Sequence, residues 1–456
     1  MTTTAPADVR PTRPAPTRRQ EWAPLVAVVL VGVGVDVAVR VGRHLAGTGT
    51  VLHLLGGFLL RGEYGPAATA HTWLPVTVAV VLVAVLPGLA VRVGWTVLLL
   101  GSAVLAAGWA VALALASGWH RLYEPLAVRY EYPHDVPRVR SIGQFLRTFV
   151  AHVPADSPDP WTTHVAGHGP LATLAFVALD RLGLTGLSWA AAMCIAGGAL
   201  AVPAVLTGVR AVAGEETARA AAPFLVLASV ALWIATSADA LFAGVSAWGV
   251  ALVAAAAARD AGPGRDVRAL AGGLLLGAAL FLSFGLTALG LLVLGVVLVH
   301  RARLGWAGVA RVLAVAALGV LAVVLAFAAG GYWWLDGFSA AGQRVRTGPS
   351  YADRPFGFFV FANLAAAALA IGPAAVGGLA ALRRSRLAVL PLAALAGVLA
   401  SDVSGLVRGE TERIWLPFYV WLLPAAAFLP ARQRRAWLLA GAVLAIWIEV
   451  HVRLEW

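Results

Sequence analysis

The segment HGPLATLAFVALDRLGL, residues 168–184, decides how the chain is threaded through a membrane. It is apolar enough to suggest a span, but it is short and carries Asp180 and Arg181. If it crossed the bilayer, every Arg-rich connection after it would change sides, although basic residues are usually enriched in cytoplasmic loops. The segment is therefore predicted to be a helix that begins at Pro170 and lies at the outer interface.

The composition of the whole chain is typical of a membrane protein. Of 456 residues, 60% are hydrophobic and 12% are charged. Apolar runs approaching ~20 residues, the length that crosses a bilayer, recur along the sequence. The predicted fold class is an all-α polytopic membrane protein with about 13 transmembrane helices. The predicted spans lie at roughly 23–44, 73–92, 94–117, 187–209, 221–236, 240–258, 268–283, 285–299, 309–329, 357–382, 387–401, 414–430 and 436–450.

The two sides of this threading differ in charge. Its inner connections are all basic, and most of the 22 acidic residues fall outside, where the long segments are 45–72, 118–186 and 330–356. The net charge of +12 is therefore assigned to loops near anionic lipid and not to nucleic-acid binding. The prediction is a multi-pass plasma (inner) membrane protein with its functional site facing outside.

The outer loop 118–186 contains the motif YEYPHDVPR at residues 130–138. Glu131, Tyr132, His134 and Asp135 bring acids, an aromatic ring and an imidazole together between prolines, a mixture suited to binding and deprotonating a polar substrate. The alternative is a solvated loop in which the acids pair with nearby arginines. Both interpretations stay open at this point.

Three further residues could add to that chemistry. His164 and His168 are four residues apart, so a divalent metal is possible, although the Gly-rich context favours a helix start at Pro170. Asp239 falls at the outer end of two spans, where an acid is either functional or a helix N-cap. Cys194 is the single cysteine, which excludes a Cys-based metal site.

Two later outer segments are rich in arginine. An external Arg runs against the usual charge bias, and a guanidinium binds phosphate bidentately, so Arg344, Arg346, Arg354, Arg408 and Arg413 are candidate phosphate ligands. Glu410 and Glu412 lie among the last two of them. The alternative is a structural network of salt bridges.

In this order, the features resemble the GT-C superfamily of membrane glycosyltransferases. The resemblance covers about residues 94–450 and is carried by YPHDV at 132–136 and by GHGP at 167–170, which is similar to the family's frequent His-Pro-Pro-Gly. RPF at 354–356 with Asn363, and GETERIW at 409–415, are similar to actinobacterial members, including decaprenyl-phosphate methylthioxylose and pentosyl transferases. Gly169 departs from the usual Pro, and the first loop lacks Asp-x-Asp, which leaves metal dependence open.

The resemblance implies an inverting transfer of a sugar from a polyprenyl-phosphate donor to a cell-envelope polysaccharide or glycolipid acceptor. Asp135 would be the general base, with Asp239 and Glu131 as the next candidates, and the five arginines would hold the donor phosphate. No metal site is assigned. The residues expected to bind the acceptor or the sugar are Tyr132, His134, His164, His168, Glu410 and Glu412.

The expected organisation has four parts: a disordered cytoplasmic arm (1–22), an extra transmembrane pair with an external loop (23–93), a GT-C-like core (94–329), and an external loop with C-terminal transmembrane helices (330–456). A transporter or flippase of a lipid-linked sugar or anionic lipid is the alternative function. A transporter of this kind is expected to carry charged side chains deep within its spans. Asp36 and Arg40 are the main pair of charged residues found there. A non-catalytic assembly partner is the third possible function. It predicts that replacing any single external acid leaves the function of the protein unchanged.

Overall fold

The computed structural model describes residues 18–456, which are almost entirely helical. Residues 1–17, and with them most of the predicted arm 1–22, lie outside the described residues. Helix α1 (Arg18–Gly47) already includes the last part of that predicted arm. Within α1, the predicted pair of Asp36 and Arg40 is confirmed, with Arg40 Nε donating to Asp36 Oδ2 at 2.7 Å.

In the described part of the chain, eight helices are long and apolar enough to cross a membrane. This finding establishes a helical, multi-pass architecture, but it does not confirm the predicted count of about 13 spans. The eight segments are Glu21–Gly47, Ala70–Arg92, Trp95–Leu115, Leu187–Ala213, Ala238–Ala257, Arg301–Ala329, Phe356–Ala380 and Arg386–Val403. In order, these segments correspond to α1, α2 (Trp73–Arg92), α3 (Trp95–Leu115), α7 (Leu187–Ala213), α9 (Ala238–Ala257), α12 (Arg301–Ala329), α15 (Phe356–Ala380) and α16 (Val389–Val403).

The other five predicted spans coincide with shorter or more charged helices. Range 221–236 is divided between α8 (Glu215–Val226) and the 3₁₀ helix η7 (Ser229–Trp233). Range 268–283 is α10 (Pro263–Leu282), whose first turns carry charged residues, and 285–299 is η8 (Phe284–Leu289) followed by α11 (Gly290–Leu298). Range 414–430 begins at the end of α17 (Thr411–Ile414) and contains α18 (Leu416–Leu422) and η10 (Leu423–Phe428). Range 436–450 lies within α19 (Arg434–His451).

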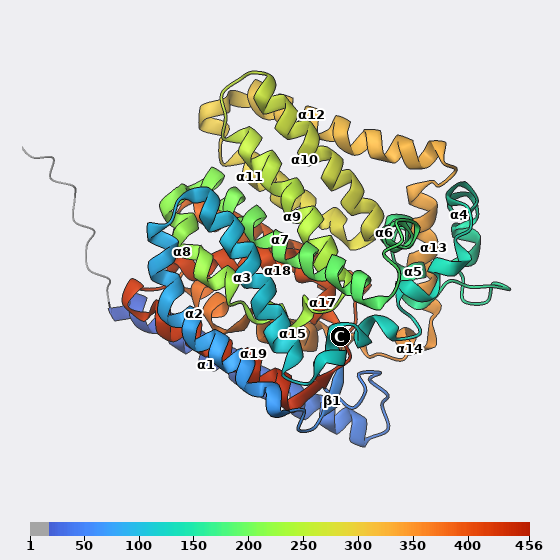
Figure 1. Cartoon of the computed structure of the whole chain (residues 1–456), viewed down its shortest axis with the longest axis horizontal. Helices are drawn as coiled ribbons and strands as arrows, with labels where there is room; N and C mark the ends of the chain where they lie inside the picture. The colour runs from blue at the N-terminus through green and yellow to red at the C-terminus, as the bar shows by residue number, and fades with distance from the viewer. Residues whose placement is uncertain (1–17) are drawn as a thin grey trace, which may run out of the picture.

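The segment 168–184 forms the short helix α6 (Pro170–Arg181), so the predicted helix start at Pro170 is confirmed. Its 12 residues rise ~18 Å, too little to cross ~30 Å of hydrocarbon. The rest of the long loop consists of single turns and short helices: η2 (Trp119–Leu122), η3 (Glu124–Ala127), η4 (Tyr132–His134), η5 (Val136–Arg138), α4 (Ile142–Thr148), η6 (Val150–His152) and α5 (Thr163–Gly167). With α13 (Trp334–Thr347) and α14 (Pro349–Ala352), these form one side of the molecule (Figure 1).

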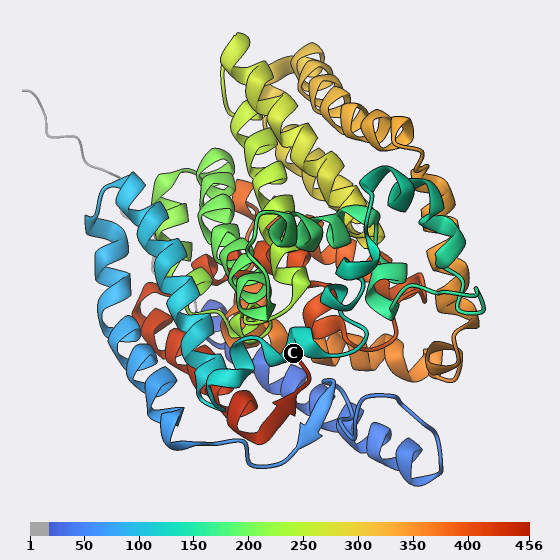
Figure 2. The same ribbon diagram turned by 45° about the vertical axis from the view of Figure 1, so that its right-hand side comes forward.

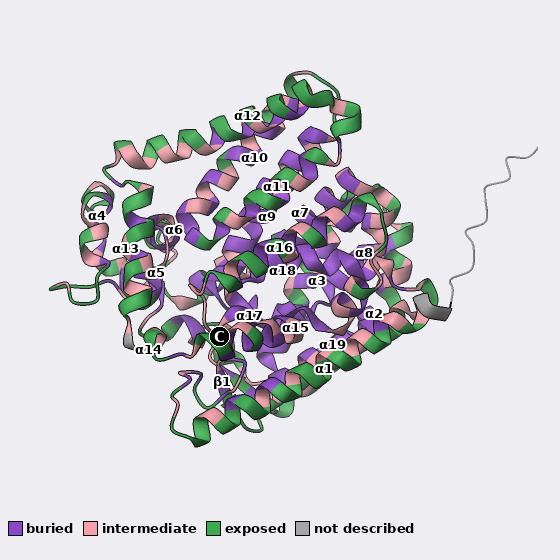
Figure 3. Cartoon of the chain, turned by 180° about the vertical axis from the view of Figure 1, so that it is seen from behind, coloured by how far each residue is buried: buried purple, intermediate pink, exposed green. Residues whose placement is uncertain are grey.

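Glycines bring the central helices close together. A Cβ on Gly244 of α9 would lie 2.1 Å from the carbonyl oxygen of Gly197 on α7, and one on Gly273 of α10 would lie 1.9 Å from that of Ala316 on α12. Small residues permit such close backbone approach between membrane helices. In contrast, α1 and α12 lie at opposite edges and are mostly exposed (Figure 3), with apolar side chains suited to contact with lipid.

A two-stranded ribbon is the exception to the all-α prediction. Strand β1 (Gly62–Tyr64) pairs antiparallel with β2 (Val452–Leu454). A Cβ at Gly62 would lie 2.6 Å from the carbonyl oxygen of Arg453, so the close pairing requires glycine. The ribbon joins segment 45–72, which lies at the lower edge of the molecule in Figure 1, to the C-terminal end of the chain. Tyr130 of the long loop contacts both Arg61 and Glu455 there.

Candidate functional site

Arg413 is the centre of a buried polar cluster. Its side chain is 5% exposed, and Nη1 donates to Asp239 Oδ2 at 2.7 Å. Its Nη2 donates to Glu410 Oε2 and to His164 Nε2, both at 2.9 Å. One cation thus binds two carboxylates and a histidine that come from three distant parts of the chain. Asp239 is in the first turn of α9, where the helix dipole also favours a negative charge.

His164 joins Arg413 to Glu131. Because a guanidinium can only donate, Nε2 of His164 is an acceptor, which places its ring proton on Nδ1. That nitrogen lies 2.9 Å from Glu131 Oε1. The other oxygen of this 4%-exposed residue, Oε2, is buried and has no hydrogen-bond partner. A buried carboxylate oxygen without a partner is costly, which makes it a candidate to receive a proton from a bound ligand.

A second arginine, Arg61, closes the cluster from the ribbon side. It donates to Glu410 Oε1 at 2.8 Å and to the hydroxyl of Tyr130 at 3.0 Å, and it also pairs with Glu455. The ring of Trp456 lies 4.0 Å from the Arg413 guanidinium carbon and 5.4 Å from that of Arg61. Glu410 therefore binds both Arg413 and Arg61, and the indole ring of Trp456 lies against both guanidinium groups.

The loop that carries Glu410 is held by Asn363 of α15. Its Nδ2 donates to Asp402 Oδ1 and to the carbonyl of Val407, and its Oδ1 accepts from the amide of Gly409, all at 2.9 Å. Gly409 has a φ of +86°, and a Cβ there would lie 3.1–3.3 Å from its neighbours. The sequence motif at 409–415 therefore depends on glycine at its first position.

The acids of the cluster ionise differently. Burial alone would raise the pKa of Glu131, but His164 and Arg413 outweigh it and leave that pKa below its usual value. For Glu410, burial is likewise outweighed by the surrounding arginines, which lower its pKa. Glu412 is fully buried, its Oε1 accepts from the amide of Arg61 at 2.8 Å, and burial raises its pKa to about 7. At neutral pH, Glu131 and Glu410 are charged, whereas Glu412 is partly protonated.

The raised pKa of Glu412 predicts a pH dependence of stability. The folded protein holds this proton up to about pH 7, whereas the unfolded chain loses it near 4.5, so stability falls as pH rises between these values. Glu412→Gln should remove this fall and stabilise the protein at pH 8 by about 3 kcal/mol relative to pH 4. Thermal unfolding of the purified protein at both pH values checks this, with the exposed Glu63→Gln as control. An equal effect of the two substitutions would contradict the prediction.

Asp135 lies in a different setting from this cluster. It is 1% exposed, its Oδ1 accepts from Arg138 Nη1 at 2.5 Å, and its Oδ2 accepts from the amide of Thr162 at 2.8 Å. Both oxygens are therefore occupied by the loop itself. His134 is largely exposed and lies 2.9 Å from the carbonyl of Ala127.

The two remaining residues predicted to bind the acceptor or sugar line the cluster. Tyr132 is buried and stacks on Phe176, with ring centroids 5.2 Å apart, and it also lies against His164 and His168. Burial lowers the pKa of His168 to about 4, so this ring is neutral. Its Nδ1 donates a hydrogen bond to the carbonyl of His164 at 2.8 Å. In residues 18–456, no group of three His, Cys, Asp or Glu side chains is arranged to hold a metal ion.

The five predicted phosphate ligands fall into two groups. Arg354 and Arg413 are held by the chain, since Arg354 donates to the carbonyls of Leu52, His53 and Arg408 and to Glu410. Arg344 donates to the carbonyl of Val153 at 2.6 Å.

Like Arg344, Arg346 and Arg408 each donate one side-chain hydrogen bond. Exposed Arg346 donates to the carbonyl of Gly342, and Arg408 donates to that of Arg354, while the buried Nε of Arg408 has no partner. Arg408 lies 4.7 Å from the ring of Tyr351, whose hydroxyl is buried. Burial raises the pKa of Tyr351 to about 12, against the opposing charges of Arg408, Arg354 and Arg346. The positive charges of these three arginines therefore all act on Tyr351.

The sequence interpretation missed four residues of the cluster: Arg61, Tyr130, Glu455 and Trp456. Arg61 did offer a signal, because an Arg in a predicted outer loop runs against the charge bias in the same way as the five arginines that were chosen. Glu455 and Trp456 lie in a short polar tail after the last apolar run, and no local pattern distinguishes them.

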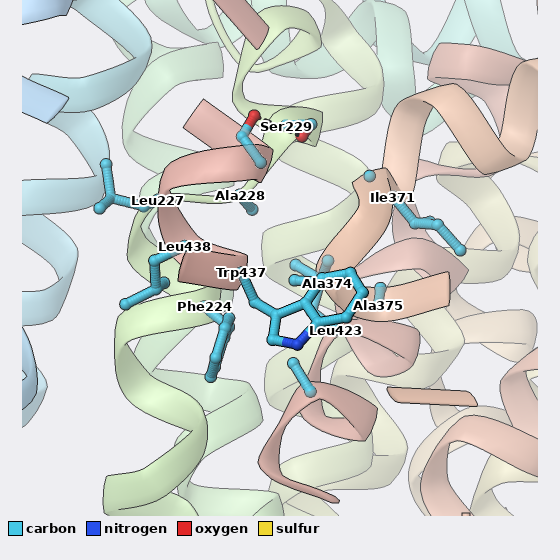
Figure 4. Close-up of a pocket in the computed structure, with 13 residues that line it drawn as sticks. Phe224, Leu227, Ala228, Ser229, Ile371, Ala374, Ala375, Leu423, Trp437 and Leu438 are labelled. Carbon is cyan, nitrogen blue, oxygen red and sulfur yellow. Dashed lines mark hydrogen bonds between the residues drawn. The ribbon is translucent and has the colours of Figure 1, made fainter. Parts of the chain in front are cut away.

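Two cavities lie outside the cluster. One, of about 10 Å³, is lined mainly by apolar side chains such as Phe224, Leu423 and Trp437 between α8, α15, η10 and α19 (Figure 4). It has room for about one water molecule and none for a substrate. The other is a polar cavity of about 260 Å³ beside strand β2.

No family model matches the chain, and no curated protein matches it. Solved structures that match include the Archaeoglobus fulgidus oligosaccharyltransferase in complex with Zn and sulfate, at 13% identity and a TM-score of 0.42, covering 78% of this chain and 53% of that one. The same archaeon's oligosaccharyltransferase AglB, with an inhibitory peptide and a dolichol-phosphate, matches at 13% identity and a TM-score of 0.42, covering 78% and 56%. The chain thus spans about half the length of these structures, and a likeness of this size assigns no family.

Proposed function

We propose that this protein is a GT-C-type membrane glycosyltransferase that transfers a sugar from a polyprenyl-phosphate donor to a cell-envelope glycan or glycolipid. The observation that carries the proposal is the buried, unpartnered Oε2 of Glu131 in a cluster organised by Arg413. Such an ionised carboxylate, next to His164 and beside the ends of membrane helices, fits a base that works on a hydroxyl group. The proposal places the site on the outer face of the plasma membrane.

Glu131 is proposed as the general base. Its Oε2 is free to accept a proton, whereas both oxygens of Asp135 are already bound, and Asp239 is committed to Arg413 through Oδ2. Asp239 and Arg413 then act as positioning residues, because they hold His164 against Glu131. The loop position of Glu131 still matches the sequence expectation of an acid in the segment 130–138.

The donor phosphate is proposed to bind near Tyr351. Arg408 and Arg346 each make one side-chain hydrogen bond to the chain, and the charges of both act on Tyr351, whose hydroxyl is buried. A phosphate there would receive charge-assisted hydrogen bonds without separating Arg413 from its carboxylates. The exposed apolar faces of neighbouring helices would accommodate the polyprenyl chain.

In the proposed reaction, the acceptor hydroxyl oxygen attacks the anomeric carbon of the donor sugar while its proton passes to Glu131 Oε2. The bond between that carbon and the phosphate oxygen breaks, and its electron pair leaves with polyprenyl phosphate. Attack opposite the leaving group inverts the anomeric configuration. The guanidinium groups stabilise the charge that develops on the departing phosphate.

The test is incubation of the purified protein with a panel of polyprenyl-phosphate pentoses and hexoses and a membrane glycolipid extract. Release of polyprenyl phosphate together with a glycosylated product is expected for at least one donor. If the protein instead moves the intact donor between the leaflets of a vesicle and releases no polyprenyl phosphate, it is a transporter and the proposal is wrong.

A further inference from the structure

We propose that the polar cavity beside strand β2 binds one sugar unit of the acceptor glycan. The proposal deepens the proposed function and rests on it. The cavity has a volume of about 260 Å³, and its lining residues come from strand β2, from the chain after β1 and after α3, and from the end of α19. Figure 2 shows the two paired strands at the end of α19. The polar lining residues are Ser117, His120, Arg121, Glu449 and Arg453, and the others are Pro66, Ala67, Val452 and Leu454.

The polar groups of the cavity are fixed by contacts with the chain. Ser117 Oγ donates to Glu449 Oε1 at 2.8 Å, which orients a carboxylate that is 8% exposed. Arg121 is held by the carbonyl of Leu454 at 2.6 Å and by Glu124 at 3.4 Å. Arg453 is exposed and has no hydrogen bond or ion pair through its side chain within residues 18–456. The cavity therefore combines a rigid acceptor with an uncommitted cation.

This lining suits a sugar ring better than an anion or a lipid chain. Hydroxyl groups both donate and accept, so they can bind Glu449 and the arginines at the same time. A phosphate dianion carries only acceptors and therefore cannot donate a hydrogen bond to Glu449, and an acyl chain would leave the charged groups without partners. Pockets for drug-sized ligands are ~300–1,000 Å³, so this smaller cavity fits a single ring.

The position of the cavity connects it to the proposed reaction centre. Leu454 lines the cavity, the next residue Glu455 pairs with Arg61, and Trp456 covers Arg413 at 4.0 Å. Leu454 and Trp456 are two residues apart, which is at most ~7 Å of backbone. A glycan that places one unit in the cavity is proposed to extend from there toward the cluster that contains Glu131.

Binding can be measured without a donor, so its outcome does not depend on transfer. The probes are octyl α-D-mannopyranoside and octyl β-D-arabinofuranoside, with octyl triethylene glycol as the chain without a sugar, and saturation-transfer NMR detects binding to the purified protein. Arg453→Ala and Glu449→Gln are each expected to weaken glycoside binding by about tenfold. The matched control is Arg92→Ala, an exposed arginine at the other end of α2 from the cavity.

Two results would overturn the inference: glycosides that bind no better than octyl triethylene glycol, or binding that both cavity variants leave unchanged. Arg453 is exposed, so its variant remains informative if Glu449→Gln fails to fold. In transfer assays, the cavity variants should need about tenfold more acceptor for half-maximal rate, with the same dependence on donor. Weakened glycoside binding without any polyprenyl phosphate release would support the sugar site and contradict the proposed transfer.

Discussion

Replacing Glu131 with Gln is expected to lower turnover by about 100-fold or more while donor binding stays intact. Gln keeps the size of the side chain and an oxygen near His164, but it cannot accept a proton from a hydroxyl group. The prediction follows from the free Oε2 and from the lowered pKa, which keeps Glu131 ionised at neutral pH. Released polyprenyl phosphate measures turnover, and equilibrium binding of the same lipid donor measures affinity.

Asp135→Asn is the matched control for this experiment. Asp135 is an equally buried acid four residues later, but its oxygens are bound to Arg138 and to the amide of Thr162. Its replacement should reduce thermal stability and keep most of the turnover of the folded fraction. If Asp135→Asn abolished turnover in well-folded protein and Glu131→Gln did not, the base would be Asp135.

Removal of the Arg413 side chain is expected to have the largest effect on stability. Arg413→Ala leaves Asp239 and Glu410 buried with one fewer cation, and breaking a buried ion pair in this way costs about 3–5 kcal/mol. Arg413→Lys keeps the charge, but a single ammonium cannot reproduce the planar geometry that binds Asp239, Glu410 and His164 together. Turnover should therefore stay low in the Lys variant even where stability is partly recovered.

Thermal unfolding compares these variants with Arg311→Ala, which breaks a 2.7 Å ion pair in which Arg311 is 61% exposed. The exposed pair should contribute less than about 1 kcal/mol. Adding Asp239→Asn to Arg413→Ala should restore part of the lost stability, because it removes one unpaired charge. Similar losses at positions 311 and 413, or no recovery in the double variant, would show that the cluster does not depend on Arg413.

Much of the architecture was predictable because the relevant signals are local. Each predicted span contains helix, since apolar runs of that length favour helices in a membrane. The short helix at 170–181 was predictable from its length, its proline and its charged end. The number of spans was not predictable from the sequence, because interruptions such as the one between α8 and η7 depend on how neighbouring helices pack.

The apolar runs of the sequence were enough to predict a helical membrane protein, and its motifs led to the prediction that 130–138 and 409–415 contribute to the functional site. Which of the candidate residues contact one another depends on the tertiary structure. Arg61 reaches Glu410 and Glu455 across separations of 349 and 394 residues, and Arg413 reaches Asp239 across 174. Helix formation follows from the pattern within a few turns, whereas the partner of a buried charge is set by long-range packing. That packing leaves an oxygen of Glu131 free and occupies both oxygens of Asp135.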